Sequence, residues 1–135
     1  MKISAKGVYA IEIMLDILEY GETTPVAIKD VAARRDISGK YAEQVVSILN
    51  AAQLVRSARG PKGGYRATEA AKTATVGTIL RLTENVLKEH NQEHESEELS
   101  AVIRELDRAI DKVLDRYTLT DVLESMHDMA DNYVI

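Results

Sequence analysis

The chain has 135 residues, 45% of them hydrophobic and 29% charged, which suits one domain with an appended element and excludes a disordered chain. It contains no cysteine, so disulfides, thiolate nucleophiles and thiolate-bound metals are excluded as well. No apolar run approaches the ~20 residues of a membrane span, and the N-terminal residues lack the apolar core of a signal peptide, so we expect a cytoplasmic, mostly helical protein.

The net charge of −5 is spread unevenly along the chain. Residues 1–83 carry 12 Lys and Arg against 8 Asp and Glu, whereas residues 84–135 carry 5 against 14. This division favours a basic contact surface in the first part and an acidic element in the second. Two ordinary solvated surfaces would give the same division, so the charge alone does not decide between them.

Three helices are predicted at the start of the chain. The first covers residues 5–20 and is ended by Gly21. Its apolar positions are Val8, Ile11, Leu15 and Leu18. A short second helix over 27–35 lacks a capping side chain at Ala27. After a tight connection Ser38 caps the third, and this pair of short helices is typical of a helix-turn-helix. The apolar positions of the third helix are Tyr41, Val45, Ile48 and Ala52.

A β-hairpin is predicted directly after these helices. Residues 54–58 and 65–67 have the composition of short strands, and the Gly-rich turn 59–64 connects them. A hairpin in this position forms a wing, so we predict a winged helix-turn-helix domain. Thr75 then caps a further helix over residues 76–87.

Polar residues fill the segment 84–98, which we interpret as a hydrated linker. After it, apolar residues spaced by four and three form a heptad seam on a predicted helix of residues 98–117. The members of the seam are Leu99, Ile103, Leu106, Ile110, Val113 and Tyr117. Packing on the chain's own domain would also explain the seam, but a regular stripe after a polar linker favours a dimerisation helix. Thr118, with Asp121 three residues later, caps a final helix.

The third helix offers exposed polar residues for reading DNA. The first turns of a recognition helix reach base edges in the major groove. The candidates are Ser38, Lys40, Glu43 and Gln44. Gln pairs with adenine, Glu accepts from cytosine, and Lys suits guanine or a phosphate. Glu43 repels phosphates, so it would select against wrong bases unless it is simply solvated. For Tyr41 we consider an inward-packed ring with a hydroxyl that meets a phosphate.

The predicted turn combines charge with glycine. Arg59 and Lys62 supply cations for phosphates or a narrow minor groove, and Gly60 and its neighbouring glycines let the backbone approach closely. The spacing does not match a nucleotide-binding P-loop, since no Ser or Thr follows the lysine. A tight surface turn is the alternative. Lys2 and Lys6 would add phosphate contacts near the first helix.

No catalytic or metal centre emerges from the sequence. His90 and His94 have a spacing that allows two metal ligands, but no third ligand is evident, so a hydrated linker is preferred. His127 is isolated on the last helix, and we expect it to be solvated. The serines have no evident His and Asp partners. We therefore predict a protein that is not an enzyme and that binds no cofactor or metal.

Residues 1–10, 37–44 and 55–65, in this order, resemble the signature segments of the winged-helix repressor family of IscR, NsrR and CymR. The resemblance is continuous over 1–83 and looser over the long helix. It implies a homodimer that crosses through that helix and a palindromic operator in double-stranded DNA. The implied contact residues are Ser38, Lys40, Tyr41, Glu43, Gln44, Arg59 and Gly60. Many members hold an iron–sulfur cluster through three cysteines before the long helix, and because residues 84–98 contain none, we expect that function to be absent.

Within that family the cluster-free CymR branch is the best match, because residues 113–119 and 131–135 resemble its tail. This resemblance implies control of sulfur or cysteine metabolism. Members of the branch end with isoleucine, as serine acetyltransferase does, and the terminal residue of that enzyme enters the active site of cysteine synthase. We therefore hypothesise that Ile135 docks on cysteine synthase. The alternative is an apolar end tucked against the dimer.

Two positions depart from the family's pattern. Gln53 stands where the family usually has glycine after the recognition helix, which would strain or lengthen that turn. Ala27 replaces a usual capping residue. Neither departure threatens the expected fold.

Together these patterns predict a mainly α fold with a winged helix-turn-helix DNA-binding domain in residues 1–83, a polar linker in 84–98, and a dimerisation helix with a C-terminal helix in 99–135. The expected function is a dimeric, sequence-specific DNA-binding transcription regulator, acting as a repressor. The residues expected to contact DNA are Lys2, Lys6, Ser38, Lys40, Tyr41, Glu43, Gln44, Arg59, Gly60, Lys62 and Tyr65. The alternative is an adaptor that works through its acidic C-terminal half, for example on cysteine synthase.

Overall fold

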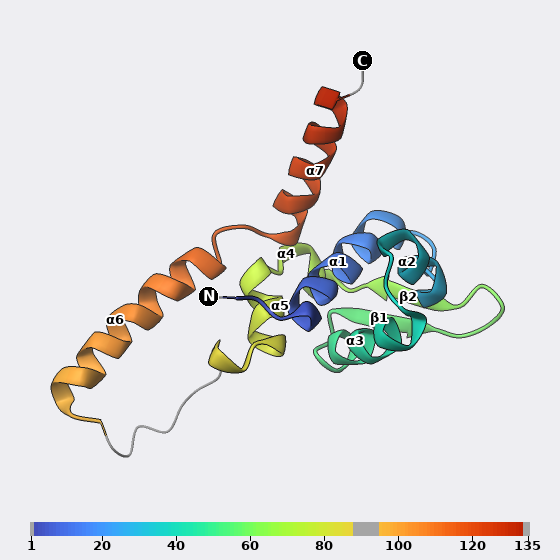
Figure 1. Cartoon of the computed structure of the whole chain (residues 1–135). Coiled ribbons are helices and arrows are strands. Elements are labelled where there is room, and N and C mark those ends of the chain that lie inside the picture. The colour runs from blue at the N-terminus through green and yellow to red at the C-terminus, as the bar shows by residue number, and fades with distance from the viewer. Residues whose placement is uncertain (1, 88–94, 134–135) are drawn as a thin grey trace.

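The structure, a computed structural model, describes residues 2–87 and 95–133. It shows a helical head with one β-hairpin and a long helix that stands away from the head (Figure 1). The elements in chain order are α1 (Ala5–Tyr20), α2 (Ile28–Arg35), α3 (Gly39–Ala51), β1 (Val55–Ala58), β2 (Gly64–Ala67), α4 (Glu69–Thr73), α5 (Val76–Thr83), the 3-10 helix η1 (Asn85–Leu87), α6 (Glu97–Leu114) and α7 (Leu119–Tyr133). The predicted fold class is confirmed. No helix in the described residues combines the length and apolar character needed to cross a bilayer.

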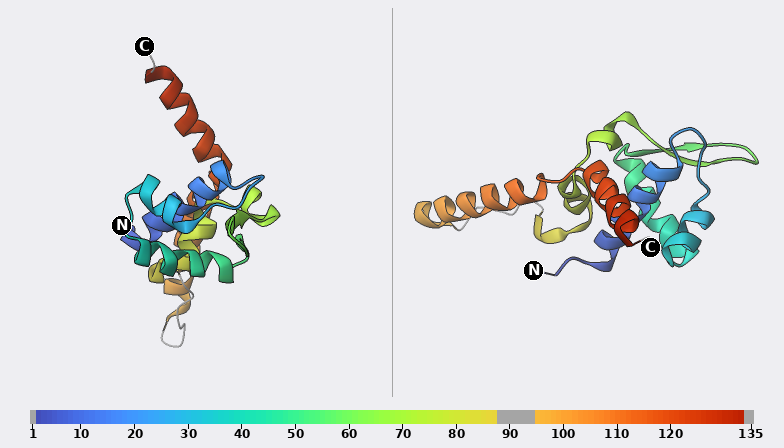
Figure 2. Two further views of the ribbon diagram at one scale, coloured as in Figure 1. Left: turned by 90° about the vertical axis from the view of Figure 1, so that its right-hand side faces the viewer. Right: turned by 90° about the horizontal axis from the view of Figure 1, so that it is seen from above.

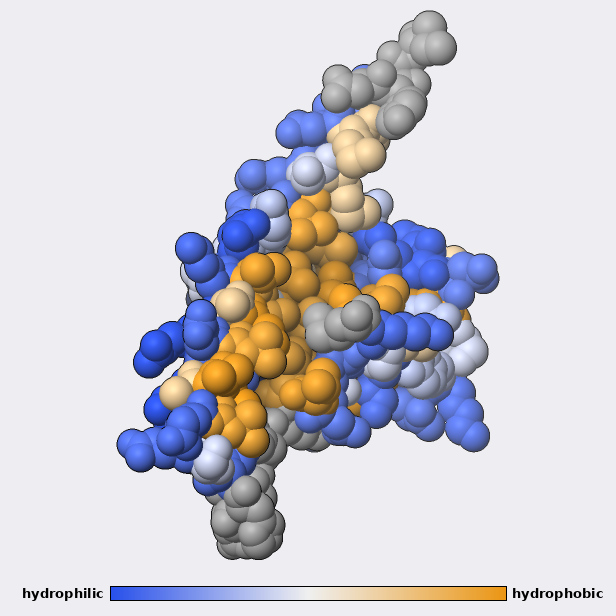
Figure 3. All heavy atoms as spheres, turned by 60° about the vertical axis from the view of Figure 1, so that its left-hand side comes forward, coloured by the Kyte–Doolittle hydropathy of each residue, from blue (hydrophilic) through white to orange (hydrophobic). Residues whose placement is uncertain are grey.

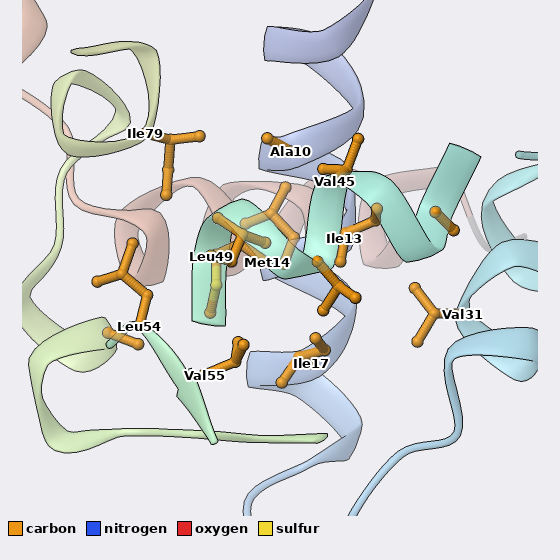
Figure 4. Packing of buried hydrophobic residues seen from close by; sticks show 14 of the residues in the cluster. Ala10, Ile13, Met14, Ile17, Val31, Val45, Leu49, Leu54, Val55 and Ile79 are labelled. Atoms are coloured by element: carbon orange, nitrogen blue, oxygen red, sulfur yellow. The ribbon is translucent and has the colours of Figure 1, made fainter. Parts of the chain in front are cut away.

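The core of the head is aliphatic and is built around α1. Its residues Ala10, Ile13, Met14 and Ile17 have no exposed surface. They lie in one cluster with side chains from α2, α3, β1 and α5 (Figure 4). Burial of one large aliphatic side chain contributes about 1.5–3 kcal/mol. Packing on α1 therefore determines the positions of α2 and α3.

The buried face of α3 differs from the predicted one. The fully buried side chains are Ala42, Val45, Val46 and Leu49. Of the predicted positions only Val45 is buried, while Tyr41, Ile48 and Ala52 lie half-buried at the edges of this face. Tyr41 and Ala52 still pack against the core cluster, as expected of apolar positions. The predicted stripe missed Ala42, Val46 and Leu49 because α3 packs on α1, on α2 and on β1, which requires a wider apolar stripe than a narrow seam.

Gln53 ends α3 in a left-handed backbone conformation, with φ of 61°. The N–H of Leu54 donates to the carbonyl of Leu49 at 3.0 Å, and the N–H of Gln53 donates to that of Asn50 at 3.0 Å, which together form a Schellman motif. A residue with a Cβ pays roughly 1–2 kcal/mol for this conformation. The strain expected at Gln53 is therefore present, and the turn itself has the usual length.

We expect Gln53→Gly to raise the free energy of unfolding by about 0.5–1 kcal/mol, because glycine adopts positive φ without a Cβ clash but loses more chain entropy on folding. Urea denaturation followed by circular dichroism measures this difference. Gln53→Ala is the matched control, since it keeps the Cβ and should change stability by less than about 0.5 kcal/mol. Equal stability of the glycine and alanine variants would contradict the expectation.

The hairpin is joined to the helix-turn-helix by a third stretch of backbone. Strands β1 and β2 are antiparallel, with Arg56 opposite Arg66. Val26, which precedes α2, donates its N–H to the carbonyl of Tyr65 at 2.9 Å and accepts from the N–H of Tyr65 at 2.8 Å. A Cβ at Gly64 would lie only 2.2 Å from the carbonyl oxygen of Val26. This close approach holds the wing at a fixed place beside α2.

Helix α5 is shorter than the predicted helix over 76–87. It ends at Thr83 because Glu84 is extended and its carboxylate accepts from the backbone N–H and the hydroxyl of Ser4, each at 2.6 Å. The bonds from Ser4 hold the pKa of Glu84 below its usual value. The short helix α4 was missed because five residues cannot show a helical period.

Helix α6 projects from the head and is held at its C-terminal end (Figures 1 and 2). Among the described residues of α6 only Leu114 is buried, and a Cβ at Gly77 of α5 would lie 2.7 Å from its Cβ. Arg81 of α5 donates to Asp115 at 2.8 and 2.9 Å and to Asp111 at 2.9 Å. The guanidinium of Arg81 lowers the pKa of Asp115 to about 2.

The predicted helix over 98–117 is wrong at its end. Helix α6 stops at Leu114, and Tyr117 lies beyond it, where its carbonyl accepts from the N–H of Val76 at 3.0 Å. Tyr117 is exposed, but it is not a member of the helical seam. The spacing of apolar residues gives no information on backbone pairing between two distant segments, so the prediction extended the helix too far.

The chain returns to the head before α7. The N–H of Leu119, a fully buried residue, donates to the carbonyl of Ala74 at 2.9 Å. The predicted cap of α7 is confirmed: the N–H of Thr118 donates to the carboxylate of Asp121 at 2.9 Å, and the N–H of Asp121 donates to the hydroxyl of Thr118 at 3.0 Å. Helix α7 is therefore anchored to the head at its first turn.

Candidate nucleic-acid interface

The N-terminal end of α3 presents the polar side chains that were expected to read bases. Ser38 caps the helix with an extended backbone, φ −62° and ψ 139°, and its hydroxyl accepts from the N–H of Tyr41 at 3.2 Å. Lys40, Glu43 and Gln44 are exposed on the first two turns. The structure thus brings Ser38 and these three residues together on one open helix end, as entry into a major groove requires.

Tyr41 and Tyr65 lie at the edge of the core. The ring of Tyr41 meets the ring of Tyr9 edge-on, with centroids 5.3 Å apart and an interplanar angle of 79°. Its inward packing agrees with one part of the expectation. Tyr65 packs against the core cluster as well, and its backbone pairs with Val26. Both tyrosines therefore support the elements that carry the exposed candidates.

The tip of the wing is a tight turn with two exposed cations. Arg59 and Lys62 are both exposed. Gly60 has a φ of 109°, and its carbonyl accepts from the N–H of Gly63 at 2.8 Å. A Cβ at Gly63 would lie 2.5 Å from the carbonyl oxygen of Ala58. The glycines therefore allow a turn narrow enough to carry the two cations at its end.

Lys2 and Lys6 lie elsewhere on the head. Both are exposed, and Lys6 is close enough to the carboxylate of Glu84 to lower its pKa further. Figures 1 and 2 place the N-terminus and the tip of the wing at opposite ends of the head. The structure therefore does not bring these two lysines together with Arg59 and Lys62.

A buried carboxylate that the sequence analysis missed holds α2 against α1. Asp16 is fully buried and accepts from Arg34 at 3.0 and 2.7 Å and from Arg35 at 3.2 Å. The bond with Asp16 holds the pKa of Arg34 above its usual value. Arg35 also donates to Glu12 at 2.9 Å. The signal in the sequence was an acid inside the apolar run 13–17, since a buried carboxylate needs a cationic partner.

The same network extends to α7. Glu19 lies 3.9 Å from the guanidinium of Arg35 and shares a hydrogen bond of 2.5 Å with Nε2 of His127. The guanidinium of Arg34 lies 4.5 Å from the centre of the Tyr20 ring, a cation–π distance. His127 is half-exposed, but it is bonded to α1 and is not simply solvated as expected. Side chains of α1 thus connect the first helix of the helix-turn-helix with the last helix of the chain.

Three residues of the sequence analysis lie outside the described residues: His90, His94 and Ile135. The histidine pair and the docking of Ile135 on cysteine synthase therefore stay predictions. The seam of α6 lies within the described residues, and its members Leu99, Leu106 and Val113 are exposed in the single chain.

Comparison with known proteins matches the chain to transcriptional regulators. The family model described as "Rrf2: Iron-dependent Transcriptional regulator" matches residues 3–125. The HTH-type transcriptional regulator IscR of Vibrio vulnificus strain YJ016 is 44% identical over 80 residues, which are 59% of this chain and 48% of that protein. The chain spans about half the length of the curated relatives it matches.

Solved structures are similar over most of the chain. CymR (YrzC), described as the global cysteine regulator of B. subtilis, is 32% identical with a TM-score of 0.75, over 93% of this chain and 98% of that one. IscR of T. potens is 32% identical with a TM-score of 0.76, over 100% and 93%. The resemblance inferred from the three signature segments is confirmed, and these relatives are transcriptional regulators, not enzymes.

The iron in the family's description does not fit the donors of this chain. Iron–sulfur clusters are held mainly by cysteine thiolates, and these 135 residues contain no cysteine. Within residues 2–87 and 95–133, no three His, Asp or Glu side chains are grouped so that they could hold a metal ion. The residues present therefore do not fit a cysteine-ligated cluster.

Proposed function

Because the chain belongs to the Rrf2 family of transcriptional regulators, we propose that it is a dimeric, sequence-specific DNA-binding repressor that acts in the cytoplasm. One observation carries this proposal. The head exposes both the N-terminal end of α3, with Lys40, Glu43 and Gln44, and the tip of the wing, with Arg59 and Lys62. The helix end would enter a major groove, and the wing would lie on the adjacent minor groove.

The two elements have different tasks in this proposal. Arg59 and Lys62 neutralise phosphates or occupy the minor groove, so they set affinity and make it salt-dependent. Glu43 and Gln44 face base edges and set sequence preference. A carboxylate beside DNA is repelled by phosphates, so Glu43 favours only sites where a base donor meets it.

The apolar seam of α6 supports the dimer. Leu106 and Val113 are 57% and 58% exposed in the single chain, and Val102, which the heptad spacing did not include, is 61% exposed. Figure 3 shows apolar surface that runs along α6 and continues over the head to α7. A projecting helix with an open apolar stripe gains most by packing on a second copy. Two heads related by a two-fold axis would read a palindromic operator.

The regulated genes proposed here are those of sulfur and cysteine metabolism. Support comes from the similarity to CymR, which is described as the global cysteine regulator of B. subtilis. A cysteine-free chain has to receive its signal without a thiolate-bound cluster. We assign that role to residues 84–135, where a partner protein or a small metabolite would change the spacing of the two heads.

Selection from a pool of random duplexes at two salt concentrations, followed by sequencing and anisotropy titration, tests the proposed function. We expect a palindromic sequence to be enriched. Arg59→Ala should weaken binding roughly tenfold, about 1.4 kcal/mol, and should reduce the slope of log K against log salt by about 1.

Arg104→Ala is the matched control, since Arg104 is exposed on α6 away from the head and its loss changes the net charge equally. It should leave the affinity unchanged. Phosphate contacts are strong at about 50 mM salt. If no sequence is enriched under these conditions, the DNA-binding proposal is overturned and the adaptor function is favoured.

A further inference from the structure

The wing carries two arginines that belong neither to the base-reading end of α3 nor to the tip of the wing. Arg56 and Arg66 are direct cross-strand partners, and both are exposed. Such partners have Cβ atoms about 4.5–5.5 Å apart, and like charges there destabilise a sheet. Arg66 donates to the carbonyl of Glu22 at 2.8 Å. Within the described part of the chain, no carboxylate pairs with either arginine, and the side chain of Arg56 has no hydrogen-bond partner.

The two arginines line a groove of about 820 Å³ between the end of α3, the hairpin and α4. The other polar residues of its lining are Asn50, Gln53, Thr68 and Glu69. Glu69 is 90% exposed and pairs with Lys72 at 3.0 Å, so Lys72 neutralises its charge. The groove is thus left with excess positive charge and with the side-chain amides of Asn50 and Gln53, which are hydrogen-bond donors to anions.

The residue by which α3 lines the groove, Asn50, lies on the same side of that helix as the base-reading Glu43. Asn50 follows Ser47 by three positions and Glu43 by seven, which places all three on one side of the helix. Arg56 of β1 precedes Arg59, the first residue after that strand, by three residues, or about 10 Å. The minor groove is only about 6 Å wide, so a strand segment that far behind a seated wing tip lies over the bordering phosphate backbone.

We propose that Arg56 and Arg66 together bind backbone phosphates of the DNA beside the wing tip. This inference rests on the proposed function and extends its contact surface from the tip of the wing to its base. Guanidinium groups match phosphate oxygens in two-pronged geometry, and a bound phosphate removes the repulsion between the two side chains. Because phosphate contacts carry no sequence information, the pair adds affinity without changing the preferred operator.

The test compares wild type with the double variant Arg56→Gln/Arg66→Gln by anisotropy titration over a series of salt concentrations, with the selected operator and with a scrambled duplex. We expect both affinities to fall by the same factor, roughly tenfold or more, and the slope of log K against log salt to become shallower by about 2. Arg104→Gln/Arg108→Gln is the matched control, with the same charge change on exposed positions of α6, and its slope should stay that of wild type.

A second variant, Arg56→Lys/Arg66→Lys, keeps the charge and should keep the wild-type slope, which separates charge loss from misfolding. If wild type binds neither duplex at about 50 mM salt, the proposed function fails and the inference fails with it. If wild type binds and the glutamine pair binds with equal affinity and slope, the inference alone fails. A loss confined to the operator would also overturn it, since that result indicates base reading. The melting temperatures of wild type and of the glutamine double variant are also compared with and without inorganic phosphate. If phosphate raises the melting temperature of wild type but not of the double variant, while the double variant binds DNA as wild type does, the pair is a small-anion site and the inference is overturned.

Discussion

Replacing Asp16 by alanine is expected to lower the free energy of unfolding by about 3 kcal/mol, because it leaves the arginines of α2 without their buried counter-charge. Asp16 is fully buried and receives three hydrogen bonds from Arg34 and Arg35. The side chain of Arg35 is only 14% exposed, so solvent cannot replace the lost carboxylate. Urea denaturation monitored by circular dichroism measures the difference.

Two further variants make this expectation specific. Asp16→Asn keeps the shape and one oxygen acceptor but removes the charge. Its free energy of unfolding should therefore lie between those of wild type and Asp16→Ala. Glu12→Ala removes the other carboxylate that Arg35 contacts, but Glu12 is 39% exposed, so the loss should stay below about 1 kcal/mol. Equal losses for Asp16→Ala and Glu12→Ala would show that the burial of Asp16 has no energetic role.

Adding a single methyl group at Gly64 should destabilise the protein by about 3 kcal/mol, the sum of overpacking and of two weakened backbone hydrogen bonds. In Gly64→Ala the new Cβ would lie 2.2 and 2.4 Å from the carbonyl oxygen and carbon of Val26. Since both are backbone atoms, either the wing or the segment before α2 has to move. The hydrogen bonds between Val26 and Tyr65 would lengthen or break.

Gly39→Ala is the control for this substitution. Nothing lies within 4 Å of a Cβ at Gly39, which is the first residue of α3, so alanine there should leave stability unchanged or raise it by up to about 1 kcal/mol. Thermal unfolding of both variants measures the difference in stability.

In the folded fraction of Gly64→Ala we also expect weaker DNA binding, because the wing no longer keeps its position beside α2. A Gly64→Ala variant with wild-type stability would contradict the close approach of the two backbones.

Local signals in the sequence were sufficient for most of the helices and for the hairpin. Ser38 and Thr118 are capping residues, and a cap is determined by neighbours in the chain, so both helix starts were predicted correctly. The exposed candidates on α3 followed for the same reason, since residues in the first turns of a helix project together whatever the rest of the fold does. The strain at Gln53 was expected from the family's pattern alone, whereas its left-handed backbone conformation was not predicted.

The remaining features depend on contacts between distant segments. The end of α5 is set by the bond between Glu84 and Ser4, eighty positions apart, and the end of α6 by the pairing of Tyr117 with Val76. The buried pairing of Asp16 with Arg34 and the groove beside Arg56 are of the same kind. Periodicity describes one helix at a time, so it could not show which side chains of different elements meet.

The attachment of α6 has a topological consequence. Two attachments to α5 flank this helix in the sequence: η1 contacts α5, and Thr118 pairs with Thr75 at the start of α5. Helix α6 lies between these two attachments in the sequence. It has 18 residues and is about 27 Å long, and each additional turn would add about 5.4 Å, compared with 3.4 Å for one base pair. In the proposed dimer that crosses through α6, the length of this helix would set the separation of the two heads, so the same head would serve operators whose half-sites are spaced differently.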